Sequence, residues 1–117
     1  MEEQIRKLLL SAGFVTEMRG YAYLTTAIRL CIESPSYLER PLKYLYTEVG
    51  NHYGVAARNV ERAIRSSVTL LWESERGYRP ESLPGKYSFY SREYVTTKVV
   101  ISHLIEAVNS GAFGFTE

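Results

Sequence analysis

The sequence predicts an all-α domain. Apolar residues recur at helical spacing in five segments, Gly or Pro residues lie between the segments, and no two alternating strands are joined by a hairpin turn. The chain has 117 residues, of which 45% are hydrophobic, which suits one core that folds without disulfides. We therefore expect a compact five- or six-helix domain over residues 1–117, built on a helix-turn-helix. In outline it would be similar to a winged-helix domain without a clear wing.

The first two helices are predicted over residues 2–12 and 21–33. Gly13 is a natural C-terminal cap for the first, and Gly20 precedes the second, which Pro35 stops. Their apolar stripes are Ile5, Leu8 and Leu9 in the first helix, and Tyr21, Leu24, Ile28, Cys31 and Ile32 in the second.

Three further helices follow. One begins near Pro41 and ends before Gly54, one spans about 57–75, and the last begins near Thr96 or Thr97 and ends at Gly111. The stretch 77–94 is irregular, with a short extended piece at 86–89. The side chains expected to be largely buried in the 57–75 helix are Val60, Ile64, Leu71 and Trp72.

Net charge, cysteine content and the distribution of apolar residues limit the classes of protein to which the chain can belong. Net charge is only +1, so nucleic-acid binding must be argued from where the charges lie. The single cysteine, Cys31, cannot form an internal disulfide, and the sequence contains no signal peptide or membrane span. A cytoplasmic protein with no membrane contact is expected.

Residues 46–65 have the pattern of a helix-turn-helix. Gly54 lies where a turn between steeply crossed helices needs a left-handed residue, and Gly50 is small enough for the second helix to approach. Val49, Val55 and Val60 are apolar where the helices must pack. The spacing alone fits an ordinary helix pair with a glycine turn equally well.

The outer face of the 57–75 helix favours DNA. Arg58, Arg62, Arg65 and Thr69 recur at i, i+4, i+7 and i+11 and so share one side. Arg62 can pair with guanine, Glu61 can accept from cytosine, and Arg65 is placed for a phosphate. A solvated face with a Glu61–Arg65 ion pair is the alternative, and such a pair contributes only about 0.3–0.5 kcal/mol.

Several strings are also those of a known family. They are GYAYL at 20–24, Tyr46 with Lys43 and Leu45 beside it, VERAIR at 60–65, Trp72, and Ser82-Leu83 with Gly85. Over about residues 8–108 the chain resembles the C-terminal effector domain of the sporulation stage-zero response regulator family. The resemblance implies a six-helix fold that binds a short asymmetric DNA box, often as tandem copies, and regulates transcription. The receiver domain that precedes this module in the family is absent from the sequence, so we expect an excised domain or a free-standing relative.

The resemblance and the Arg face together give the candidate site. Candidates for base reading are Arg58, Asn59, Glu61 and Arg62, and candidates for phosphate contact are Lys43, His52, Arg65, Ser66 and Thr69. The family usually has Ser then Arg where this chain has Arg58 then Asn59, and often a Thr before the helix where this chain has Val55 and Ala56. The DNA box is therefore expected to differ.

Other residues are weaker candidates. His52 and His103 have no second metal ligand at suitable spacing, and no catalytic motif surrounds Cys31, so neither a metal, a cofactor nor an enzyme is expected. Packing is the simpler role for the aromatic residues, which are Tyr21, Tyr23, Tyr44, Tyr46 and Tyr53, and the cluster Tyr87, Phe89, Tyr90 and Tyr94. The cluster's alternative role is contact with a second copy or with RNA polymerase. The alternative function for the whole chain is a protein-binding helix-turn-helix that antagonises a full-length regulator.

Overall fold

The structure, a computed structural model, describes residues 1–73 and 97–111. Its elements are α1 (Glu2–Ala12), α2 (Arg19–Glu33), the 3-10 helix η1 (Pro35–Glu39), α3 (Leu42–Tyr53), α4 (Ala57–Glu73) and α5 (Thr97–Asn109). No strand occurs in these two ranges. The predicted all-α fold is confirmed.

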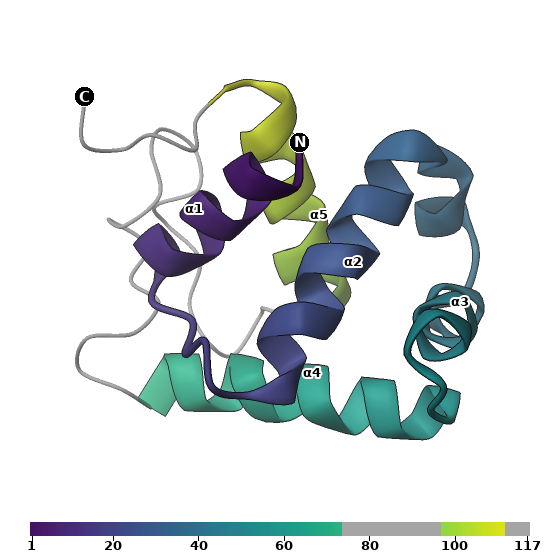
Figure 1. Cartoon of the computed structure of the whole chain (residues 1–117). Helices are drawn as coiled ribbons and strands as arrows, with labels where there is room; N and C mark the ends of the chain where they lie inside the picture. The colour runs from purple at the N-terminus through teal and green to yellow at the C-terminus, as the bar shows by residue number, and fades with distance from the viewer. Residues whose placement is uncertain (74–96, 112–117) are drawn as a thin grey trace.

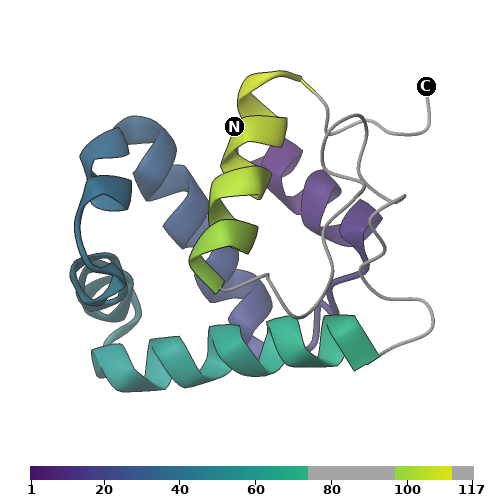
Figure 2. The ribbon, with the colours of Figure 1, turned by 180° about the vertical axis from the view of Figure 1, so that it is seen from behind.

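Helix α2 is the centre of the domain. It packs against α1, α3, α4 and α5, and Figures 1 and 2 show α4 running across one end of the other helices. The core holds apolar side chains from all five α-helices, including Ile5, Leu24, Leu45, Ile64 and Ile101, each fully buried. Burial of this kind, at roughly 25 cal/mol per Å² of apolar surface, is the main force that holds α4 in place.

The helix ends follow the sequence signals closely. Gly13 and Gly54 have positive φ angles of 103° and 73° and end α1 and α3, as their lack of a side chain allows. Pro41 directly precedes α3, and α5 begins at Thr97. The helix η1 was not predicted, because five residues are too few to show a periodic stripe.

One helix start differs from the sequence prediction for a physical reason. Gly20 was expected to precede the second helix, but α2 begins at Arg19 and contains Gly20 in its first turn. A Cβ atom at this position would overlap the Ser67 hydroxyl and the carbonyl oxygen of Ala63, both on α4. Gly20 is therefore required by the close approach of α2 to α4.

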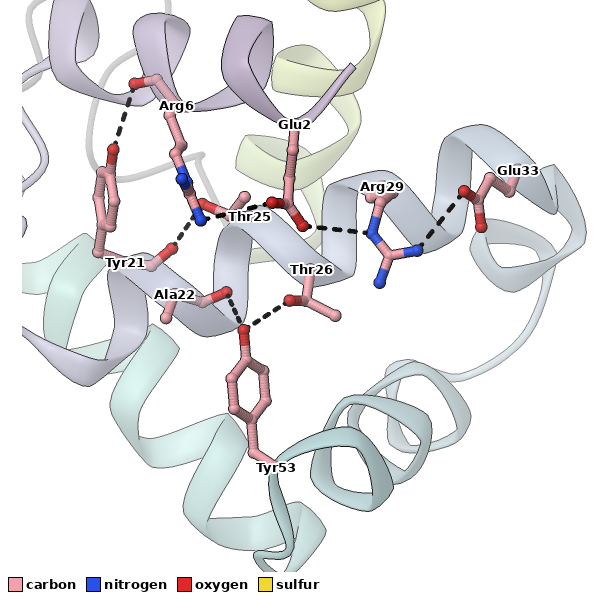
Figure 3. Close-up of polar contacts among 9 residues, drawn as sticks. All are labelled: Glu2, Arg6, Tyr21, Ala22, Thr25, Thr26, Arg29, Glu33 and Tyr53. Atoms are coloured by element: carbon pink, nitrogen blue, oxygen red, sulfur yellow. Dashed lines mark hydrogen bonds and ion pairs between the residues drawn. The ribbon is translucent and has the colours of Figure 1, made fainter.

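Polar contacts tie the outer helices to α2 (Figure 3). The Tyr53 hydroxyl, at the end of α3, donates to the Ala22 carbonyl at 3.2 Å and lies 2.7 Å from the Thr26 hydroxyl. Because the phenol has one proton, the Thr26 hydroxyl is left to donate to the phenolic oxygen. At the other side of α2, Arg29 pairs with Glu2 of α1 at 3.6 Å. The Tyr53 contacts hold the end of α3 that leads into α4, and the Arg29–Glu2 pair joins α1 to α2.

The tyrosines and Cys31 were expected to pack in the core, and this is correct only in part. Tyr23 and Tyr46 are buried, whereas Tyr44 is 47% exposed and Tyr53 40% exposed. Tyr44 lies on the outer face of α3 and is flanked by the cationic groups of Arg40 and Lys43, 5.8 and 5.4 Å from its ring centroid. The Cys31 thiol is buried, which raises its pKa to about 11, so it is an inert core residue.

Some predictions lie outside the described residues. They concern the side chains of Leu71 and Trp72, the irregular stretch 77–94 with its extended piece, and the aromatic cluster Tyr87, Phe89, Tyr90 and Tyr94. Within the described part, no helix combines the length and apolar character that crossing a membrane requires.

Candidate nucleic-acid interface

Helices α3 and α4 form the predicted helix-turn-helix. In Figure 1, α3 is seen nearly end-on while α4 runs across the picture, so the two helices cross steeply. Gly54 makes the turn in the left-handed conformation, and the Val55 amide donates to the Gly50 carbonyl at 2.9 Å. A Cβ on Gly50 would overlap the Val55 carbonyl oxygen, which explains why a glycine one turn before the end of α3 is needed. Both glycines have the roles predicted for them.

Helix α4 is strongly amphipathic, with one buried and one exposed face. Val60, Ile64, Ser67 and Val68 are buried, whereas the candidate residues Arg58, Asn59, Arg62, Arg65, Ser66 and Thr69 are all exposed. At about 100° per residue, Arg62 lies near the middle of the exposed face, with Asn59 and Glu61 on opposite sides of it. The structure therefore presents a row of three arginines along one open helix face.

A cleft opens on the Glu61 side of this face. It has a volume of about 610 Å³ and joins three helices. Its lining includes four of the predicted site residues, Lys43, Arg58, Glu61 and Arg65. Thr97, predicted only as a possible helix start, and Lys98, which the sequence did not single out, also line it. Only the tertiary fold brings the start of α5 to this place, so no local signal could have found Lys98.

A smaller hollow of about 270 Å³ lies on the Asn59 side. Asn59, Arg62 and Ser66 line it together with Arg19 and Tyr23 from α2. Arg19 was also missed, because in the sequence it is one arginine among ten with no periodic partner. It adds a cation beside the N-terminal half of α4.

The Glu61–Arg65 ion pair predicted as the alternative is present. The two side chains meet at 2.9 Å and are 46% and 61% exposed, so the pair contributes little to stability. Burial raises the pKa of the neighbouring Tyr46 hydroxyl to about 12, with a further upward effect from Glu61 and an opposing one from Arg65. Arg65 is thus held in place without losing its access to solvent.

The two remaining phosphate candidates, His52 and Thr69, differ in position. His52 is exposed in the last turn of α3 and packs edge-on against the Tyr53 ring, with centroids 4.8 Å apart. Thr69 lies in a third hollow with Met18, Arg65, Ser66 and Leu70. His52 is therefore separate from the row of arginines, whereas Thr69 extends it.

The described residues contain no group of three His, Cys, Asp or Glu side chains that could hold a metal ion. Most of the polar side chains that line the hollows around α4 are instead Arg, Lys, Asn, Ser and Thr. Such side chains donate hydrogen bonds to phosphates and base edges.

A comparison with protein families decides the assignment. Residues 5–110 match the family described as "Sporulation initiation factor Spo0A C terminal". The chain belongs to this family. Its members are the DNA-binding effector domains of a sporulation transcription factor, which is not a family of enzymes. The match covers α5 and most of α1 as well as the helix-turn-helix, so the resemblance first found in the sequence strings extends over most of the described fold.

Proposed function

We propose that the chain is a sequence-specific transcription regulator that binds double-stranded DNA through α4. The observation that supports this most is the exposed row of Arg58, Arg62 and Arg65 on the second helix of a helix-turn-helix. In such motifs the second helix lies in the major groove, and its N-terminal residues contact base edges. The family assignment supports the same function.

The positions of the side chains on α4 suggest which residues recognise bases and which contact phosphates. Arg62, at the centre of the exposed face, reads a base, and Asn59 and Glu61 read neighbouring positions beside it. Arg65, one turn later and next to the cleft, contacts a phosphate together with Lys43 from α3. Asn59 pairs with adenine through its amide, since an amide side chain can bond to adenine N6 and N7 together.

The proposal also covers where the protein acts and what it binds besides a single DNA box. Residues 1–117 act as one effector domain in the cytoplasm, and the protein pairs with a second copy on adjacent DNA boxes. RNA polymerase is the proposed downstream partner. These features follow from the family's role in transcription.

Binding-site selection from a random DNA pool, followed by titration at several salt concentrations, tests the proposed function. We expect one enriched sequence, and an affinity for it that falls steeply with salt because phosphate contacts release counterions. The alternative, a helix-turn-helix that binds another regulator, predicts no enriched sequence. The net charge of +1 is the observation that favours that alternative.

A further inference from the structure

Helix α4 has a cation from another helix on each of its sides. On the Asn59 side, Arg19 of α2 lines the hollow of about 270 Å³. On the Glu61 side, Lys98 of α5 lines the cleft of about 610 Å³. Both cationic residues are exposed. The exposed face of α4 therefore lies between two cations that belong to other helices.

The two cations lie on nearly opposite sides of α4. A rotation of about 100° per residue places Asn59 about 60° to one side of Arg62 and Glu61 about 100° to the other, so that these two residues are about 160° apart around the helix. Arg19 is beside the first of them and Lys98 beside the second. Arg62, the candidate for base reading, faces outward between the two.

Packing holds Arg19 next to α4. Gly20, the next residue, lies so close to α4 that a Cβ atom on it would overlap the Ser67 hydroxyl and the Ala63 carbonyl oxygen. Figure 1 shows the start of α2 beside α4. The backbone of Arg19 therefore keeps its place relative to α4 as long as this contact is intact, while its side chain remains exposed.

Lys98 is held in the first turn of α5. Val100 and Ile101, which follow it closely, are buried in the core, and α5 packs against α4. Figure 2 shows that α5 begins at its end nearest α4. Neither Lys98 nor Arg19 forms an ion pair or a hydrogen bond with another residue in the part of the chain that the structure describes. Both charges are therefore available to an external anion.

The dimensions of DNA indicate which anion each cation meets. An α-helix with its side chains is about 10–12 Å across, and the major groove of B-DNA is about 12 Å wide and about 8.5 Å deep. A helix that fills the groove has one sugar-phosphate backbone on each side, and these two backbones belong to opposite strands. Helices α2 and α5 lie on the side of α4 away from its exposed face (Figures 1 and 2), so their side chains meet the rim of the groove, where the phosphates are, and not the base edges.

We propose, as an inference that rests on the proposed function, that Arg19 and Lys98 contact backbone phosphates of opposite DNA strands on the two sides of α4. The Arg19 guanidinium group donates to a phosphate of one strand, and the Lys98 ammonium group donates to a phosphate of the other. Together they position α4 in the groove and add affinity without base preference, since phosphate contacts carry no sequence information directly.

The first part of the test is a titration of the DNA site selected for the parent chain, at several salt concentrations. Arg19→Gln and Lys98→Gln should each lower the salt slope by about one, and the double variant by about two, with unchanged base preferences. Arg19→Lys and Lys98→Arg should keep the parent slope, because they keep the charge. Lys7→Gln, on the exposed side of α1, is the matched control and should behave as the parent does.

The second part locates the contacts by ethylation of single phosphates in the same DNA. Ethylation removes the charge of a phosphate, so it should weaken binding of the parent chain at phosphates on both strands. In Arg19→Gln this sensitivity should disappear at a phosphate of one strand. In Lys98→Gln it should disappear at a phosphate of the other strand.

Three outcomes overturn the proposal. The first is the parent salt slope in either glutamine variant. The second is a changed base preference in either variant, which means that the residue reads a base. The third is a loss of ethylation sensitivity on the same strand in both. In each case the proposed function stands, provided that the parent still binds an enriched sequence and Arg62→Ala still alters its base preference. If the parent binds no enriched sequence, the proposed function fails as well.

Discussion

At the scale of single residues, the turn depends on Gly54. Its φ of 73° is one that L-residues with a side chain rarely adopt, yet a Cβ built there meets nothing within 4 Å. Strain in the backbone, and not a clash, is therefore the reason for glycine. The reason for glycine is different at position 50, because a Cβ on Gly50 would overlap the Val55 carbonyl.

Gly54→Val should lower the free energy of unfolding by about 1–2 kcal/mol, the penalty of a left-handed L-residue. Gly54→Asn is the control and should lower it less, because asparagine tolerates this conformation better. Urea unfolding of the three proteins gives the comparison. If the valine variant were as stable as the parent, the helix-turn-helix geometry would lose its main support.

Tyr46 gives a second prediction, on pH. Its pKa is raised from the ordinary 10.0 to about 12, so folding favours the neutral phenol. The stability it supports is fully present below pH 10.0 and is lost as the pH rises towards about 12, because the unfolded chain ionises first. Tyr46→Phe should flatten this loss in denaturant melts at alkaline pH, whereas Tyr44→Phe, at an exposed position, should not. An equal effect from both variants would contradict the burial of the Tyr46 hydroxyl.

At the scale of elements, the packing of α2 on α4 sets the position of the recognition face. The two helices meet at Gly20, where the Ser67 and Ala63 atoms lie too close for any side chain. The exposed arginines stand on the opposite side of α4. A change that separates the two helices should therefore disturb both stability and DNA binding.

Gly20→Ala tests this contact. Overpacking of a tight contact costs about 1–3 kcal/mol, and the overlap here includes a backbone carbonyl, which cannot rotate away. Thermal unfolding of this variant should show the loss. Ala22→Gly, at an exposed position of the same helix, should cost only about 1 kcal/mol, the difference in helix propensity. A Gly20→Ala variant that is more stable than the parent would disprove the close approach.

Most helices could be predicted from the sequence because the helical spacing of their apolar residues and the Gly or Pro residues at their ends are local signals. Gly13 and Gly54 end helices where expected, and the exposed row from Arg58 to Thr69 followed from helical periodicity alone. Gly20 was placed outside its helix because a glycine in a first turn looks like a breaker until the neighbouring helix is known. Lys98 could not be found, since its approach to Arg58 is set by the packing of α5.

At the scale of the whole molecule, one side of α4 is left open by the other helices. Figures 1 and 2 show α1, α2, α3 and α5 on the same side of α4. The exposed arginines can therefore approach a duplex without rearrangement of the fold. A rigid fit of this kind is the usual case for a preformed interface.

The family assignment leads to a prediction about assembly. We expect a monomer in free solution that binds cooperatively to DNA with two adjacent boxes, because a second bound copy gains contacts with the first. Sedimentation of the free protein, and titration of DNAs that differ only in box spacing, measure this. Independent binding at every spacing would contradict it.

We propose that Arg62 recognises a base and that Arg65 contacts a phosphate. Titration of Arg62→Ala and Arg65→Ala against the selected site and each of its single-base changes tests this most directly. Arg62→Ala should weaken binding by roughly 1–3 kcal/mol and relax the preference at one guanine. Arg65→Ala should weaken all sites about equally and lower the salt slope by about one ion. Lys7→Ala, on α1, should match the parent. If Arg62→Ala bound the selected site as tightly as the parent and with the same base preferences, α4 would not be the reading helix.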